Sequence, residues 1–98
     1  MKISFVIPAH NERANITNML ALLVKNFDKV TGEIIIVDDC STDQSEKLLN
    51  DLKRKYKKLK VINRKYNGGV GNAIREGLKN ISTETDYVFL IDCDTIIS

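Results

Sequence analysis

The chain has 98 residues, of which 43% are hydrophobic and one is proline, so it is long enough for one small folded domain and too apolar for a disordered segment. Its 15 basic and 13 acidic residues give a formal net charge of +2, which by itself points to no class of partner. The start lacks the unbroken apolar run of a secretory signal, and the longest helical apolar run, Met19 to Val24, is far shorter than the about 20 residues that span a bilayer. We therefore expect a cytoplasmic protein with two reduced thiols, Cys40 and Cys93.

Short apolar runs alternate with helical patterns along the chain. A first strand runs from Ile3 to Ile7 and is ended by Pro8. A helix over about Asn11–Phe27 follows, because its apolar residues recur at helical spacing. The β-branched run Ile34–Val37 then predicts a second strand that is buried on both faces.

The second half of the chain continues this alternation. Ser41 to Gln44 fits a capping box, with a hydroxyl at the N-cap and a glutamine three residues later, and predicts the start of a helix that extends to about Tyr56. The remaining predicted elements are a strand at Val61–Ile62, a glycine turn at Asn67–Gly71, a helix through Ala73 to Ile81 and a strand at Tyr87–Ile91.

Strict alternation of strands and helices predicts an α/β fold, a Rossmann-like sheet of four mainly parallel strands in the order 3-2-1-4 with helices on both faces. In that order the strands that precede Cys40 and Cys93 lie about 10 Å apart, beyond the reach of a disulfide, so both thiols are expected to be free. Ligands of such sheets bind beyond the carboxyl ends of the strands. The polar residues at those ends are His10, Asn11, Glu12, Asp38, Asp39, Asp92 and Asp94.

Asp92-Cys93-Asp94 follows the fourth predicted strand. Side chains alternate along an extended segment, so Asp92 and Asp94 project to one side and Cys93 to the other. Two neighbouring carboxylates repel unless a cation lies between them, and oxygen ligands suit Mg²⁺ or Mn²⁺. The alternative is a pair of acids solvated at a strand end, since this spacing is common.

Asp38 and Asp39 end the second predicted strand, where a carboxylate accepts hydrogen bonds from a nucleobase or a ribose. We expect Asp38 to face backbone donors and Asp39 to face a ligand. At the end of the first strand, Asn11 is most simply an N-cap and Glu12 favourably meets the helix dipole. His10 is the only histidine and is most simply a polar surface group.

The glycine turn and the basic stretch carry weaker signals. Gly68, Gly69 and Gly71 match neither the Walker pattern nor the dinucleotide fingerprint, so a plain turn and a close approach to a diphosphate stay open. Eight basic residues and no acid lie between Lys53 and Lys65. This stretch is a solvated surface or a peripheral contact with an anionic membrane, and without an aromatic stripe it does not indicate nucleic-acid binding.

Four segments in order resemble glycosyltransferase family 2, the inverting enzymes with the GT-A fold. They are Val6–Glu12, Ile35–Asp43, Asn67–Ala73 and Asp92–Asp94. The resemblance implies that the chain binds the nucleoside-diphosphate part of a UDP- or GDP-linked sugar. The residues it assigns to this binding are Pro8, His10, Glu12, Val37, Asp39, Asp92, Cys93 and Asp94, with Asp92 and Asp94 as the ligands of Mg²⁺ or Mn²⁺.

The resemblance also implies direct displacement at the anomeric carbon, with a glycan, a lipid phosphate or another acceptor. A catalytic base is expected beyond Ser98, so residues 1–98 are interpreted as a fragment that lacks the acceptor-binding part and is inactive alone. Val70 stands where many relatives carry a basic residue in the glycine turn, which leaves Arg75 as a substitute phosphate ligand. The alternatives are a non-catalytic nucleotide-sugar-binding or interaction module and a phosphoacceptor receiver domain.

Overall fold

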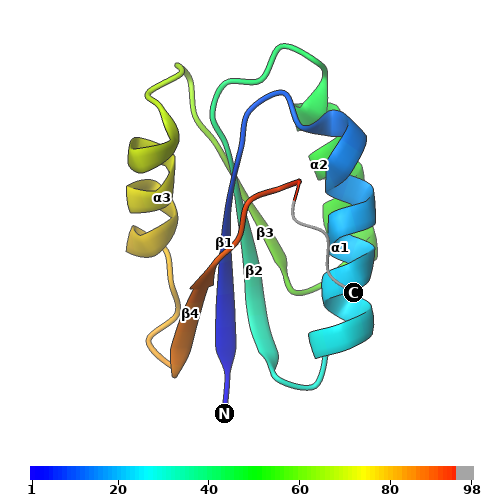
Figure 1. Ribbon diagram of the computed structural model, residues 1–98, viewed down its shortest axis with the longest axis vertical. Helices are drawn as coiled ribbons and strands as arrows, with labels where there is room; N and C mark the ends of the chain where they lie inside the picture. The colour runs from blue at the N-terminus through cyan, green and yellow to red at the C-terminus, as the bar shows by residue number, and fades with distance from the viewer. Residues whose placement is uncertain (95–98) are drawn as a thin grey trace.

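The computed structural model describes residues 1–94 and forms a four-stranded sheet with helices on both faces (Figure 1). All strands are parallel and their order is β3-β2-β1-β4, which confirms the predicted topology. The elements in chain order are β1 (Ile3–Ala9), α1 (Arg13–Phe27), β2 (Thr31–Asp38), α2 (Ser45–Lys55), β3 (Leu59–Asn63), α3 (Val70–Lys79) and β4 (Tyr87–Leu90).

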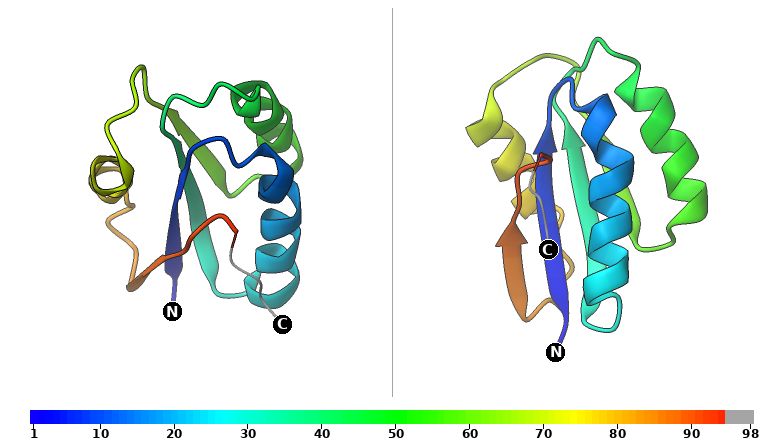
Figure 2. Two further views of the ribbon diagram at one scale, coloured as in Figure 1. Left: turned by 45° about the horizontal axis from the view of Figure 1, so that its top comes forward. Right: turned by 45° about the vertical axis from the view of Figure 1, so that its right-hand side comes forward.

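The β-branched run of β2 supplies the core on both sides of the sheet. Ile34 and Ile36 pack in the larger cluster beneath α1 and α2, whereas Ile35 and Val37 pack with Ala73 of α3 on the opposite face. The two views of Figure 2 show the same division, with α3 alone on one side. Strand alternation therefore explains why a continuous apolar run is required at this position.

Helix α3 lies unusually close to the sheet because of Gly77. A Cβ atom at this position would lie 2.5 Å from Cγ1 of Val6 and 3.2 Å from Cγ2 of Val37, both in the sheet. Only a residue without a side chain fits such an approach. The sequence does not predict a role for Gly77, because a glycine inside a helix does not indicate which residues pack against it.

Strand β1 continues through Pro8 to Ala9, so the prediction that Pro8 ends it is wrong. In a parallel strand, successive residues face opposite neighbours. The carbonyl of Val6 accepts from Ile91 on the β4 side, so Pro8 faces the same side. Because β4 ends at Leu90, opposite Val6, the missing N–H of Pro8 removes no hydrogen bond between strands.

The helix starts differ from the predicted caps. Helix α2 begins at Ser45, preceded by Gln44 with φ of 67°, and the predicted capping box around Ser41 does not form. Asp43 instead accepts from the backbone N–H of Arg13 at 3.0 Å and of Ser45 at 3.1 Å, and thereby caps both α1 and α2. Burial would raise the pKa of Asp43, but these hydrogen bonds and that of the Ser45 hydroxyl hold it below its ordinary value of 3.8.

Glu33 joins four segments at the end of the sheet where the strands begin. Its side chain is buried and accepts hydrogen bonds from Lys60 Nζ (2.6 Å), Ser4 Oγ (2.5 Å) and the N–H of Ser82 (2.8 Å). Burial by itself would raise the pKa of Glu33, but these bonds outweigh it and leave the pKa below the ordinary 4.5. The carboxylate thus fixes the segment between α3 and β4 against β1, β2 and β3.

Strand β4 is an open edge of the sheet. Within residues 1–94 it pairs with β1 only, and all four of its side chains are exposed, from Val88 at 39% to Tyr87 at 57%. Phe89 nevertheless contacts Phe5 edge-on, with ring centroids 5.8 Å apart. The strand is therefore fixed by its hydrogen bonds to β1 and by this contact.

We expect Gly77→Ala to lower the free energy of unfolding by about 1–3 kcal/mol, because the new methyl group overpacks the interface of α3 with Val6 and Val37. In an exposed helix the same change stabilises by about 1 kcal/mol, so the sign is diagnostic. Urea denaturation measures it. Gly71→Ala, whose Cβ would meet nothing within 4 Å, is the matched control and should not destabilise.

Glu33→Gln should lower the free energy of unfolding by about 1–3 kcal/mol at pH 7, since Lys60 loses its ion pair and Ser4 and Ser82 lose a charged acceptor. The folded-state pKa lies below 4.5, so the carboxylate contributes fully above that pH and loses its contribution as pH falls through the folded pKa. Denaturation from pH 7 to pH 3 should therefore show the two proteins converging. Glu84→Gln, with a side chain 76% exposed, is the control, and a pH-independent difference for Glu33→Gln would contradict the assignment.

Candidate functional site

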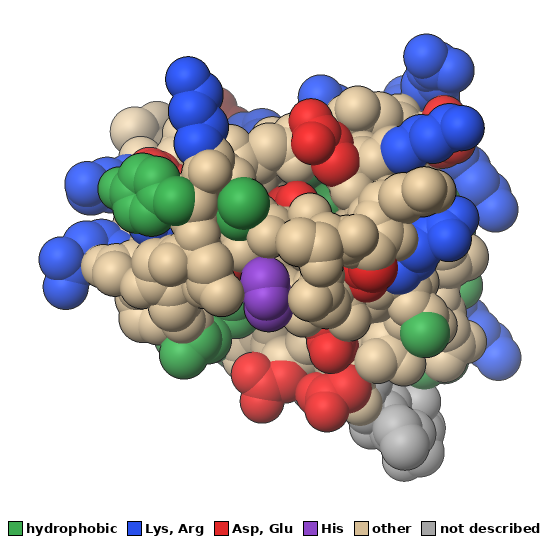
Figure 3. Space-filling model, turned by 90° about the horizontal axis from the view of Figure 1, so that it is seen from above, with side chains coloured by type: hydrophobic (Ala, Val, Ile, Leu, Met, Phe, Trp, Pro, Cys, Tyr) green, Lys and Arg blue, Asp and Glu red, His purple; other side chains and the backbone are tan. Residues whose placement is uncertain are grey.

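The polar residues predicted to converge lie at one edge of the sheet. We call this edge the carboxyl rim and define it by residues 9–12, 39–44, 64–69 and 91–94, which follow the four strands. Seen from above, acidic side chains surround the chain's single histidine on this rim (Figure 3). The parallel topology thus places all four sequence segments on one surface.

A hollow of about 220 Å³ opens in the rim between β1, β2 and α3. It is smaller than a typical complete ligand pocket of about 300–1,000 Å³, so it is sized for one part of a larger ligand. Three residues predicted from the sequence, Pro8, His10 and Asp39, line it. Val37 does not: it is fully buried between the sheet and α3. The other lining residues are Ala9, Asn67, Gly69, Val70 and Ala73.

Asp39 is buried and held by three donors. Its Oδ1 accepts from the N–H of Gly68 at 3.2 Å and forms an ion pair with Nε of Arg64 at 3.2 Å, and its Oδ2 accepts from the N–H of Gly69 at 3.0 Å. A carboxylate offers about four acceptor positions, so about one remains unused by these three donors. Asp39 is therefore rigidly placed and still able to accept one hydrogen bond.

The predicted division of roles between Asp38 and Asp39 is wrong for the backbone donors. Asp39, not Asp38, accepts the backbone N–H groups, and Asp38 accepts the hydroxyl of Ser41 instead. The same bonds decide how the glycine turn is used. Two of its amides, those of Gly68 and Gly69, point at Asp39, which favours the plain-turn interpretation over a cradle for phosphate.

His10 and Asn11 tie the ends of β1 and β2 together. Nδ1 of His10 lies 2.9 Å from the carbonyl oxygen of Asp39, and because a carbonyl only accepts, Nδ1 is the donor of this hydrogen bond. Asn11 has a φ of 54° and is not the N-cap of α1; its Oδ1 accepts from the N–H of Thr42 at 2.7 Å. Both side chains therefore fix the loop around the hollow.

Asp92 and Asp94 are exposed in a turn that follows β4, and Cys93 between them is buried. The opposite orientation of Cys93 agrees with the prediction, although β4 ends at Leu90 and not at Ile91. Burial, together with the negative charges of Glu12 and Asp94, raises the pKa of the Cys93 thiol to about 12. Glu12, at the start of α1, therefore lies near enough to this turn for its charge to act on the Cys93 thiol.

The two exposed carboxylates fit a hard divalent ion as donors. Within residues 1–94 no cluster of three or more His, Cys, Asp or Glu residues forms a complete metal site. Mg²⁺ commonly takes only one or two protein carboxylates and fills the remaining positions with water and substrate phosphates. Asp92 and Asp94 supply such a partial set, and the buried thiol of Cys93 faces away from it.

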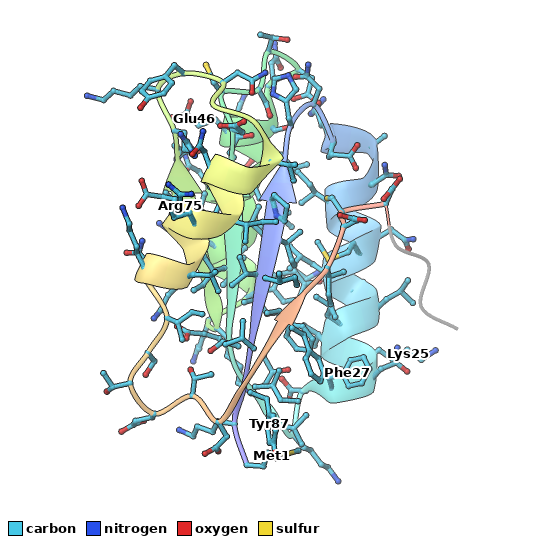
Figure 4. All side chains as sticks on the ribbon, turned by 60° about the vertical axis from the view of Figure 1, so that its left-hand side comes forward. Met1, Lys25, Phe27, Glu46, Arg75 and Tyr87 are labelled. Carbon is cyan, nitrogen blue, oxygen red and sulfur yellow. The ribbon has the colours of Figure 1, made fainter. Side chains whose placement is uncertain are left out.

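The structure adds Arg64 and Asn67 to the residues predicted for the site. Arg64 pairs with Asp39 and stacks over the ring of Tyr66 at 5.6 Å, and Asn67 lines the hollow. Arg64 belongs to no pattern that marks a site, whereas Asn67 opens the glycine turn Asn67–Ala73, which the resemblance includes without assigning Asn67 a role. Arg75 lies midway along α3, below the rim, which does not support its role as a substitute phosphate ligand (Figure 4). Cys40 and Cys93 are free thiols, as predicted.

Comparison with known proteins identifies the family. Residues 4–98 match the profile of glycosyl transferase family 2. The chain is 41% identical over 98 residues to a poly(ribitol-phosphate) beta-glucosyltransferase of Bacillus spizizenii, covering 99% of this chain and 15% of that protein. The family match also decides against the receiver-domain alternative.

Solved structures show the same fold. The crystal structure of Staphylococcus aureus TarS 1–349 in complex with UDP-GlcNAc superposes with a TM-score of 0.81 at 35% identity, over 96% of this chain and 27% of that chain. The mannosyltransferase PcManGT from Pyrobaculum calidifontis, in complex with GDP-Man and Mn²⁺, gives a TM-score of 0.82 at 20% identity, over 95% of this chain and 27% of that chain. The chain thus spans less than a third of each of these proteins.

We expect Asp39→Asn to loosen the glycine turn. An amide nitrogen cannot accept, so at least one of the N–H groups of Gly68, Gly69 and Arg64 loses its partner, at a cost of about 1–3 kcal/mol. Hydrogen exchange should quicken at the amides of Gly68 and Gly69. The amides of α1 serve as the internal reference, and equal protection of the turn in both proteins would refute this assignment.

Proposed function

This chain belongs to glycosyl transferase family 2, and we propose that it is the part of such an enzyme that binds the nucleoside diphosphate of a sugar donor. One observation carries the proposal: a hollow lined by Pro8, His10 and Asp39 lies on the same rim as the exposed pair Asp92 and Asp94. The first group suits a nucleoside and the second a diphosphate with its counter-ion. TarS binds UDP-GlcNAc, which supports a donor of this chemical class.

Asp39 would read the base or the ribose through its remaining acceptor position. Its three donors already fix the carboxylate in place, so binding of the nucleoside would cost little additional side-chain entropy at Asp39. The exposed Nε2 of His10 would accept a second hydrogen bond at the mouth of the hollow. Glu12 and Val37 also belong to the proposed nucleotide-sugar site, Glu12 beside the acidic turn and Val37 as the buried support of Asp39.

Asp92 and Asp94 would hold Mg²⁺ or Mn²⁺ between them and the diphosphate, and Cys93 would anchor their turn in the core. When bound, the ion supplies positive charge that stabilises the departing diphosphate. PcManGT contains Mn²⁺ together with GDP-Man, which supports this choice of ion. Glu12 adds a third carboxylate near the same turn and so strengthens the attraction for a cation.

Sugar transfer with inversion, and residues 1–98 as the donor-binding part that is inactive alone, complete the proposal. The catalytic base expected beyond Ser98, the acceptor and the cytoplasmic location stay predictions. No helix within residues 1–94 is long and apolar enough to cross a membrane. The basic residues between Lys53 and Lys65 would supply a peripheral contact with an anionic membrane surface.

The decisive experiment is calorimetry of UDP and GDP with and without Mn²⁺. We expect weak binding that Mn²⁺ strengthens at least about tenfold, or about 1.4 kcal/mol, because the ion joins the acidic turn to the diphosphate. The double variant Asp92→Asn/Asp94→Asn should lose the effect of Mn²⁺ and keep the fold.

Asp51→Asn, an exposed acid on α2 away from the rim, is the control and should behave as the original protein. Absence of metal-dependent heat with either nucleotide would sink the site assignment. An unchanged response in the double variant would reject Asp92 and Asp94 as the ligands and leave the hollow to be tested by Asp39→Asn.

A further inference from the structure

A second surface lies at the opposite end of the sheet. We call it the amino rim and define it by residues 1–2, 25–30, 55–58 and 82–86, which precede the strands. Figure 4 shows Met1, Lys25, Phe27 and Tyr87 together at this end, away from the carboxyl rim. The predicted basic stretch does not form one surface: its first part reaches the amino rim, whereas Arg64 pairs with Asp39 on the carboxyl rim.

The amino rim carries a pocket that the donor site does not use. It has a volume of about 330 Å³ and lies between the last turns of α1 and α2 and the start of β2. Val24, Ile34 and Tyr56 give it apolar walls, and its mouth is bounded by lysines. The complete lining is Val24, Asp28, Thr31, Ile34, Lys55, Tyr56, Lys57 and Lys58.

Positive charge dominates the mouth of this pocket. Its one acid, Asp28, is already paired with Lys58, whose Nζ also donates to the carbonyl oxygen of Asp28 at 2.7 Å. Within residues 1–94, Lys55 and Lys57 have no carboxylate within ion-pair distance. The helix dipole accounts for a basic residue in the last turn of α2, such as Lys55, but not for Lys57 in the loop beyond it.

Apolar side chains accompany the lysines on the same end. Met1 on the amino rim is 72% exposed, and Tyr87, the first residue of β4 at the same end of the sheet, is 57% exposed. Lysines beside exposed apolar and aromatic residues make up the surface by which proteins adsorb to anionic bilayers, where charge attracts and apolar groups enter the headgroup layer. A bilayer without net negative charge would not attract the lysines electrostatically.

We propose that the amino rim docks on an anionic phospholipid bilayer, with the pocket between α1 and α2 receiving the glycerol and upper acyl part of one lipid and Lys55 and Lys57 contacting its phosphate. This deepens the peripheral-contact part of the proposed function and does not depend on donor binding. Docking by this end turns the carboxyl rim to the aqueous side, along a molecule whose longest dimension is 35 Å.

Co-sedimentation of the 98-residue chain with phosphatidylglycerol and phosphatidylcholine vesicles tests the proposal. Binding should occur with phosphatidylglycerol only and fall as salt rises. Each lysine contributes about fivefold, so Lys55→Gln/Lys57→Gln should weaken partitioning by about 25-fold. Lys47→Gln/Lys65→Gln, with the same change in net charge at exposed positions away from the amino rim, is the matched control and should bind as the original chain does.

Val24→Phe separates lipid insertion from adsorption by charge alone, because it fills the pocket and leaves every lysine in place. We expect it to weaken vesicle binding at least tenfold without changing the binding of UDP or GDP. Equal binding to both vesicle types, or a control variant that loses as much as Lys55→Gln/Lys57→Gln, would overturn the proposal. So would unchanged binding of Val24→Phe, or an oligonucleotide that displaces the vesicles from the chain.

Discussion

Strand β2 is the segment on which the rest of this structure depends. Its continuous run Ile34–Val37 fills the core on both faces, with Ile34 and Ile36 on the side of α1 and α2 and Ile35 and Val37 on the side of α3. The polar residues at its two ends are fixed by that burial: Glu33 closes a network at the amino end, and Asp39 collects three donors at the carboxyl end. A shift of β2 by one residue would exchange the two faces of the sheet and displace both carboxylates at once.

The sequence predicted the fold well because its signals are repeated along the chain. Each strand is an apolar run followed by a polar pair, and alternation with helices leaves few topologies to consider. The same reasoning predicted that Pro8, His10 and Asp39 lie at one rim with Asp92 and Asp94. In the structure the first three line one hollow, and the last two are exposed in the turn after β4. The predictions that were wrong concern side chains whose hydrogen-bond partners come from distant parts of the sequence. Asn11 resembles an N-cap in sequence, yet its side-chain oxygen accepts a hydrogen bond from the backbone N–H of Thr42, in another loop.

The two ends of the sheet have opposite character. Acidic side chains gather where the strands end, and lysines gather where the strands begin. In a parallel α/β fold the helices run opposite to the strands, so their positive ends point to the carboxyl rim and their negative ends to the amino rim. Most of the charge distribution therefore complements the helix dipoles. Lys57 lies in the loop after α2, so the helix dipole does not account for its charge, and it adds positive potential to the amino rim.

The open edge at β4 has a consequence for how this chain behaves in concentrated solution. In the part of the chain that the structure describes, one side of the strand displays backbone donors and acceptors without a neighbouring strand, and all four side chains, Tyr87 to Leu90, are hydrophobic and exposed. Natural sheets usually protect such an edge with lysine, proline or a bulge, none of which β4 contains. Two copies meeting edge to edge would extend the sheet across the pair. The stretch that carries the acidic turn is thus also the stretch most prone to self-association.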